Sequence, residues 1–223
     1  MRKKEIGKHK PKMNKGVDRI LILAPHTDDG EMGCGGSIAK FIEEDKEVFY
    51  AAFSTAEESV PPGFCKNILE IEIKDAIQKI GIRPQNLIIY KFEVRKLNYF
   101  RQEILEELIK LKKEIEPDLI FMPSLNDSHQ DHLTVAHEGL RAFKTKTILG
   151  YELIWNNLAF NTTSFIKLDK RHVEKKSDAL MEYRSQRERI YMSKEFILSL
   201  AKARGIQIGT EYAEAFEVVR FIM

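Results

Sequence analysis

The chain has 223 residues, of which 43% are hydrophobic, and this suits one ordinary domain with a sizeable core. Lysine and arginine number 36 against 34 acidic residues, and this near balance argues against a broad nucleic-acid-binding surface. No apolar run approaches the ~20 residues of a membrane span, and the N-terminus lacks the apolar core of a secretion signal.

The first sixteen residues are predicted to form a basic, flexible N-terminal tail. They hold seven lysine or arginine residues and one glutamate, which is typical of a solvated terminus. No internal repeat, low-complexity tract or linker follows them. Residues 17–223 are therefore predicted to form a single domain.

Apolar strands and amphipathic helices alternate over the first 143 residues, and this order is typical of a parallel sheet covered by helices. After residue 143 we expect two strands, one or two helices over 172–204 and a last strand at 214–222. The sequence thus predicts an α/β fold, a Rossmann-like, mostly parallel sheet flanked by helices, with extra C-terminal strands and helices. The expected strands of the first part are 19–24, 48–54, 86–92 and 118–123, and the expected helices are 37–45, 66–80, 104–115 and 131–143.

Two polar clusters follow the first and fourth predicted strands, "PHTDDGE" after residue 24 and "NDSHQDH" after residue 125. The carboxyl ends of parallel strands gather at one edge of a sheet, where ligands bind. We therefore expect the two clusters to form a single site, although about a hundred residues separate them.

The residue types of these clusters are those of a mononuclear zinc hydrolase. Catalytic zinc takes three protein ligands and keeps one position for water, whose pKa falls to about 7. His26, Asp29 and His132 are the expected ligands, and Asp28 is the expected general base. His129 is expected to act as an imidazolium that stabilises the oxyanion and protonates the leaving nitrogen, with Asp131 orienting it and holding it charged.

Two other interpretations use the same residues. The glycines before the predicted helix suggest a metal-free nucleotide or methyl-donor loop, although the G-x-G-x-x-G spacing is absent. His26, Asp28 and His132 also match the residue types of the facial triad of non-haem iron oxygenases. Those sites usually lie on all-β barrels, whereas this chain alternates strands and helices. Cys34, close to the acidic cluster, is interpreted as buried filler or as a soft ligand.

The motifs resemble those of the PIG-L (LmbE-like) family of zinc-dependent de-N-acetylases, which are approximately P-H-P-D-D-E with a later glycine pair, and D-x-H-x-D-H. Here they stand as 25–29 with Gly35 and Gly36 beyond, and as 127–132. The resemblance implies a Rossmann-like domain and the same ligand, base and His129 roles. This sequence departs from the family pattern at three positions. Thr27 replaces the usual proline, Gly30 stands where the family has glutamate, with Glu31 one position later, and Leu69 stands where an arginine is common.

The resemblance implies a small N-acetylated amino sugar as substrate, an N-acetylglucosamine conjugate such as a nucleotide sugar, a surface-glycan precursor or a small thiol precursor. Arg95, Arg101, Tyr151 and Trp155 are the candidate substrate-binding residues. The expected cofactor is Zn²⁺, with Fe²⁺ as another divalent choice. A third interpretation is a protein that keeps the fold and has lost catalysis. The presence of all five candidate ligand and catalytic residues argues against it, namely His26, Asp28, Asp29, His129 and His132. The two cysteines are too few for a disulfide framework, so a cytoplasmic protein is expected, as a monomer or homo-oligomer.

Overall fold

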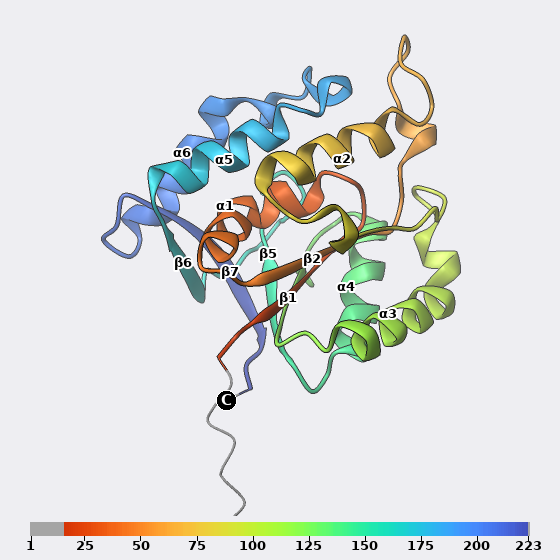
Figure 1. Ribbon diagram of the computed structural model, residues 1–223, viewed down its shortest axis with the longest axis horizontal. Coiled ribbons are helices and arrows are strands. Elements are labelled where there is room, and N and C mark those ends of the chain that lie inside the picture. The colour runs from red at the N-terminus through yellow and green to blue at the C-terminus, as the bar shows by residue number, and fades with distance from the viewer. Residues whose placement is uncertain (1–15, 223) are drawn as a thin grey trace, which may run out of the picture.

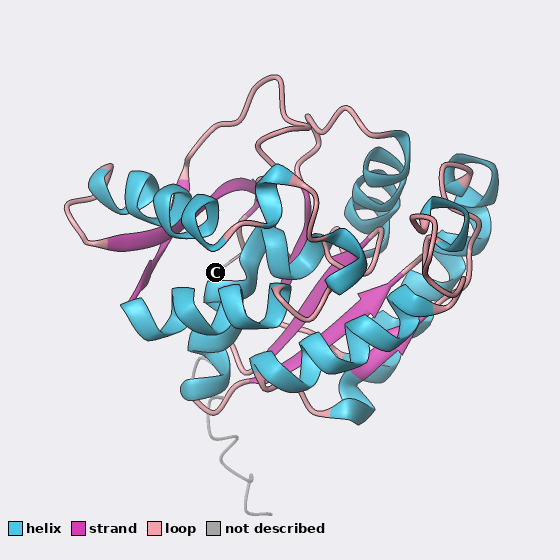
Figure 2. Cartoon of the chain, turned by 90° about the horizontal axis from the view of Figure 1, so that it is seen from above, coloured by secondary structure: helices cyan, strands magenta, loops and turns pink. Residues whose placement is uncertain are grey.

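The computed structural model describes residues 16–222, so the predicted basic tail lies outside the described residues except for Gly16. These residues form one seven-stranded sheet in the order β3-β2-β1-β4-β5-β7-β6. Seen from above, the strands lie between groups of helices (Figure 2). Within the described part of the chain, no helix combines the length and the apolar character needed to cross a membrane.

The first five strands are parallel to one another, and helices connect them. This confirms the predicted α/β fold with a mostly parallel sheet. The elements are β1 (Arg19–Ala24), α1 (Asp29–Glu43), β2 (Glu47–Ala52), α2 (Ile68–Ile80), β3 (Leu87–Ile89), α3 (Arg101–Ile115), β4 (Leu119–Pro123), α4 (Gln130–Ala142) and β5 (Thr147–Tyr151).

The C-terminal part extends the sheet with antiparallel strands. β7 (Tyr212–Arg220) pairs with β5 on one side and with β6 (Ser164–Leu168) on the other, both antiparallel. Two helices, α5 (Lys170–Leu180) and α6 (Lys194–Ile206), lie between β6 and β7 in the chain. The expected extra strands and helices are thus present, and β7 starts two residues before the predicted range.

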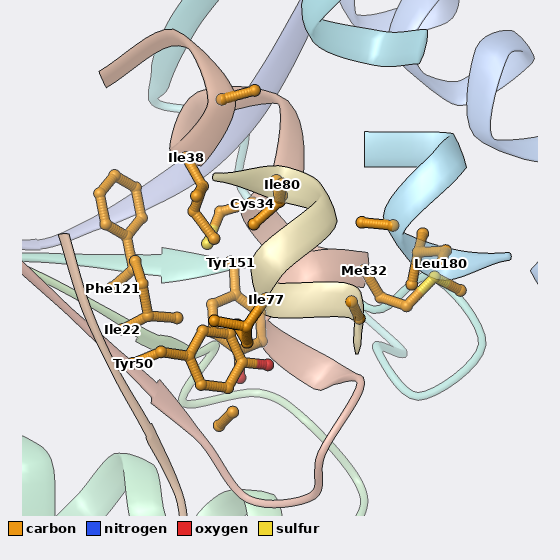
Figure 3. Close-up of a cluster of buried hydrophobic side chains, with 14 of the residues drawn as sticks. Ile22, Met32, Cys34, Ile38, Tyr50, Ile77, Ile80, Phe121, Tyr151 and Leu180 are labelled. Atoms are coloured by element: carbon orange, nitrogen blue, oxygen red, sulfur yellow. The ribbon is translucent and has the colours of Figure 1, made fainter. Parts of the chain in front are cut away.

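Alternation along the buried strands sends side chains into two separate cores, since successive residues of a strand face opposite sides. Ile20 and Ile22 pack with α1, α2 and α5, whereas Leu21 and Leu23 pack with α3 and α4. Figure 1 shows α1, α2 and α5 on one side of the sheet and α3 and α4 on the other. Figure 3 shows part of the first core, where Ile22, Tyr50 and Tyr151 face α1.

Helix α1 begins at Asp29, eight residues before the predicted start at Ser37, so the glycines lie in the helix and not in a loop. A kink at Cys34 divides it. A side chain at Gly33 would collide with the Tyr151 ring, whose atoms lie as near as 2.3 Å to an added Cβ. Gly33 therefore lets α1 approach β5 closely, and this packing accounts for a glycine that suggested a nucleotide loop.

Beyond the kink, the second half of α1 is capped from a distant strand. Glu214 of β7 accepts the amide hydrogens of Gly36 and Ser37 at 3.0 and 2.7 Å, and the Ser37 hydroxyl at 2.6 Å. Lys176 of α5 donates to Glu214 at 2.7 Å and to the Met32 carbonyl at 2.6 Å. These contacts hold the helix that carries Asp29 against the C-terminal part.

Candidate metal centre

The turn after β1 and the turn after β4 meet at the carboxyl edge of the sheet, as expected from the sequence. Asp29 Oδ2 lies 3.1 Å from His26 Nδ1 and 3.2 Å from His132 Nε2. The two imidazole nitrogens lie 3.2 Å from each other. Three candidate ligand atoms from two distant segments therefore form a nearly equilateral triangle.

This triangle fits one face of a tetrahedral zinc site. Zinc–nitrogen and zinc–oxygen bonds of about 2.0–2.1 Å place neighbouring ligand atoms of a tetrahedron about 3.3 Å apart. The three separations at the site, 3.1, 3.2 and 3.2 Å, lie close to that value. Asp29, and not Asp28, supplies the carboxylate oxygen between the two imidazoles, so the triad imagined for an iron oxygenase does not form.

The other nitrogen of each imidazole contacts a buried carboxylate. His26 Nε2 lies 3.0 Å from Asp131 Oδ2, and His132 Nδ1 lies 2.8 Å from Asp127 Oδ2. Such a carboxylate fixes the tautomer of a ligating histidine and raises its basicity. With an ion bound, each histidine would thus turn its unprotonated nitrogen toward the shared centre.

The Asp131 carboxylate, which we expected to orient His129, contacts His26 instead. It also accepts the amide hydrogens of Arg95 at 2.6 Å and Leu97 at 3.2 Å. The chain adopts a left-handed conformation at Arg95, with φ of +65°, next to that amide contact. Asp131 therefore supports a candidate ligand and ties the segment after β3 to α4.

At the three candidate ligands, burial and the charges of neighbouring groups shift the pKa in opposite directions. Burial would lower the pKa of His26, but Asp29 and Asp131 outweigh it and raise that pKa to about 9. Burial would also lower the pKa of His132, but Asp29 and Asp127 outweigh it and raise that pKa to about 10. Burial would raise the pKa of Asp29, but the two histidines hold it well below its usual range. Protons and a metal ion would compete for these nitrogens.

His129 has a different environment from the other two histidines. It is the N-cap of α4, and its Nδ1 accepts the amide hydrogen of Asp131 at 3.1 Å, which makes Nε2 the protonated nitrogen. Burial and the neighbouring His132 and His26 lower its pKa to about 4. The surroundings thus favour a neutral Nε2–H donor over the expected imidazolium. A second donor set, His26, His129 and His132, also brings one nitrogen each within 4.8 Å.

Asp28 lies half-buried beside the triad and forms part of the pocket above it. Burial and the adjacent Asp29 raise the pKa of its carboxyl, whereas Arg189 acts in the opposite direction. A carboxylate near a metal centre with a raised pKa suits proton transfer near neutral pH.

Glu31 lies one position after the place of the glutamate in the family motif, and its side chain points into the core. It contacts the hydroxyls of Tyr50 and Tyr183, which also approach the Thr27 carbonyl at 2.9 and 2.7 Å. Burial, the largest cause, raises the pKa of Glu31 to about 8. This network fixes the backbone between His26 and Asp28.

A pocket of about 240 Å³ opens above the three candidate ligands. Arg95 and Trp155, two of the candidate substrate-binding residues, line it, and so does Leu69, which stands where an arginine is common in the family. Arg101 does not line it, because its guanidinium pairs with buried Glu138 at 2.6–2.7 Å. Tyr151 does not either, because it is fully buried and donates to the Leu23 carbonyl.

The same pocket includes residues that the sequence interpretation missed, chiefly Arg189 and Tyr191. They lie in the segment between α5 and α6, which is far from both motifs in the chain. The only available signal was the richness of "YRSQRERIY", residues 183–191, in aromatic, amide and basic side chains.

Comparison with known sequences matches residues 21–143 to the profile of the PIG-L family, described as GlcNAc-PI de-N-acetylase. A protein of Escherichia coli K12, named as the uncharacterized deacetylase YaiS, is 28% identical over 172 residues, 74% of this chain and 90% of that protein.

Two solved structures illustrate the likeness in fold. The N,N'-diacetylchitobiose deacetylase of Pyrococcus horikoshii has a TM-score of 0.76 at 21% identity, over 91% of this chain and 84% of that one. The 4-carboxy-2-hydroxymuconate hydratase GalB of Pseudomonas putida has a TM-score of 0.73 at 15% identity, over 93% and 98%. The fold thus accompanies different reactions, so the function must be argued from the site.

Proposed function

The chain belongs to the PIG-L family, and on that premise we propose that it is a zinc-dependent de-N-acetylase of an N-acetylglucosamine-type conjugate. The proposed reaction consumes one water and one acetamide and releases acetate and the free amine. Zn²⁺ is the proposed ion, held by His26, Asp29 and His132. The convergence of these three ligand atoms, 3.1–3.2 Å apart, is the observation that carries the proposal.

When bound, the ion supplies Lewis-acid chemistry: it lowers the pKa of a water and polarises the acetamide carbonyl. In our proposal Asp28 takes the proton of the attacking water and later delivers it to the leaving nitrogen. The Nε2–H of His129 donates to the carbonyl oxygen as negative charge develops there, as a donor of an oxyanion hole does. Asp127 and Asp131 hold the two ligating imidazoles in place.

Arg95 and Trp155 are retained in the proposal as substrate-binding residues, because both line the pocket over the proposed ion. A volume of about 240 Å³ accommodates a sugar residue. Both cysteines are free, and we propose a cytoplasmic setting for the enzyme.

The direct test is acetate release from a panel of N-acetylglucosamine conjugates, with the protein first stripped by a chelator and then reloaded with Zn²⁺ or Fe²⁺. We expect no turnover by the stripped protein and recovery at about one ion per chain. Activity that persists after complete metal removal would contradict the zinc-dependent proposal. Tight nucleotide binding by a protein without metal would favour the nucleotide-binding alternative.

A further inference from the structure

Two arginines from different parts of the chain line the pocket above the proposed metal centre. Arg95 lies in the segment between β3 and α3, and Arg189 lies between α5 and α6. Both side chains therefore contribute positive charge to the space in which a substrate would lie.

Neither guanidinium has a carboxylate within ion-pair distance in the described residues 16–222. Arg95 donates only to neutral oxygens, the Ser59 hydroxyl at 2.9 Å and the Glu58 carbonyl at 3.4 Å. Most arginines of the described chain do have acidic partners, namely Arg19, Arg83, Arg101, Arg141, Arg171, Arg184 and Arg204. The two pocket arginines are thus exceptions to the usual pairing.

Two stacked aromatic rings, Tyr191 and Trp155, hold the guanidinium of Arg189 in position. The guanidinium donates to the Tyr191 hydroxyl, and its central carbon lies 5.8 Å from the centre of the Tyr191 ring. The Tyr191 ring in turn stacks on Trp155, with ring centres 3.8 Å apart and planes inclined by 8°. Such contacts restrict the long arginine side chain before any ligand arrives.

The segment that carries Arg189 is anchored to the body of the protein. Glu72 of α2 is fully buried and accepts both the amide and the hydroxyl hydrogen of Ser185, at 2.9 and 2.6 Å. The amide of Arg189 donates to the Gln186 carbonyl at 3.0 Å. The position of Arg189 over the pocket is therefore built into the fold.

Asp28 attracts Arg189 electrostatically, but the two do not form an ion pair within 4.0 Å. In the described part of the chain, Tyr191 is the sole hydrogen-bond acceptor of the Arg189 guanidinium. A planar guanidinium has five N–H donors and binds carboxylates and phosphates through two of them at once. Donors therefore remain for an acceptor supplied by a ligand.

We propose that the pocket selects an N-acetylated sugar that carries an anionic substituent, a phosphate or a carboxylate, which Arg189 and Arg95 bind. This inference rests on the proposed de-N-acetylase function and specifies its substrate class. Trp155 and Tyr191 form the adjoining apolar wall. Arg189 and Arg95 thereby determine specificity, while the metal ligands and Asp28 carry the reaction.

The test compares acetate release from N-acetylglucosamine 1-phosphate, N-acetylglucosamine 6-phosphate and N-acetylmuramic acid with release from the uncharged methyl glycoside of N-acetylglucosamine. The variants are Arg189→Gln and Arg95→Gln. Arg187→Gln is the matched control, because Arg187 is exposed, also lacks an acidic partner within residues 16–222, and lies outside the pocket.

We expect the wild type to prefer one of the charged substrates by about tenfold or more in kcat/KM, through KM. Arg189→Gln should reduce that preference about tenfold, because a charge-assisted hydrogen bond is lost. Whichever charged compound shows the effect identifies the anion as phosphate or carboxylate. Arg187→Gln should keep the wild-type preference.

An equal loss in Arg189→Gln on charged and uncharged substrates would overturn the proposal and assign Arg189 to Asp28 instead. Titration calorimetry of the zinc-loaded protein with glucosamine 1-phosphate, glucosamine 6-phosphate, muramic acid and glucosamine separates this result from a failure of the proposed function. Binding of an anionic sugar that depends on Arg189, without acetate release from any compound, would contradict the deacetylase and keep the anion site. Equal binding of charged and uncharged sugars would contradict the anion site.

Discussion

The parallel part of the protein, residues 19–151, and the C-terminal part, residues 152–222, contribute different things to one pocket. The parallel part supplies the candidate ligands, the carboxylates behind them and Asp28. The C-terminal part supplies the wall with Trp155, Arg189 and Tyr191. In our proposal the chemistry depends on strand ends of the sheet, whereas selectivity depends on segments added after it together with Arg95 of the parallel part.

The largest effect is expected from removing a ligand in the parallel part. His132→Ala deletes one corner of the triad, and we expect loss of the ion and acetate release at background level. Zinc content by plasma mass spectrometry and acetate release measure the two effects. His137→Ala, an exposed position on the same helix, is the control and should keep both. A His132→Ala protein that retains one ion per chain would exclude His132 from the ligands.

The next effect separates the base from the ligands. Asp28→Asn should keep the bound zinc and lose about 10²–10⁴-fold in kcat, since general acid–base catalysis contributes that much. Metal content and steady-state kinetics on one substrate measure the difference. Turnover within a few-fold of the wild type would assign the proton transfer to another group.

A stability measurement tests how firmly the C-terminal part holds the parallel part. Glu214→Gln leaves the buried Lys176 ammonium without its carboxylate and weakens the cap on α1. We expect a loss of about 3–5 kcal/mol in the free energy of unfolding, as for other broken buried ion pairs. Urea denaturation provides the measurement, with exposed Glu103→Gln as control. A loss below 1 kcal/mol would show that the α1 cap contributes little.

The smallest expected effect concerns a surface contact between α1 and α5. Glu43 accepts from Arg171 at 2.7 and 2.9 Å and contacts His172 at 2.7 Å, and these partners lower its pKa from 4.5 to about 2. A depressed carboxyl pKa stabilises the fold above the unfolded value and loses that effect as the pH falls through the folded value.

The thermal midpoints of wild type and Glu43→Gln should therefore differ by a constant amount above pH 4.5 and converge toward pH 2. Thermal scans at several pH values measure the difference. A difference that grows as the pH falls would contradict this sign.

The alternation of strands and helices could be predicted from the sequence, because it shows in local hydrophobic patterns. The three candidate ligands could be named for the same reason, because they lie in two short motifs. The start of α1 could not be predicted, since glycines favour loops locally, whereas Gly33 lies in a helix where the neighbouring Tyr151 ring leaves no room for a side chain. The partner of Asp131 and the place of Arg189 depend on contacts between distant segments, which no local pattern records.

The cap that Glu214 places on α1 also sets an order of events during synthesis. The ribosome releases the chain from its N-terminus, so the helix bearing Asp29 emerges about 180 residues before its cap. The two motifs can be complete on the nascent polypeptide while that helix still lacks its final support. A premature stop before residue 214 would leave every proposed ligand encoded in a protein whose α1 lacks that cap.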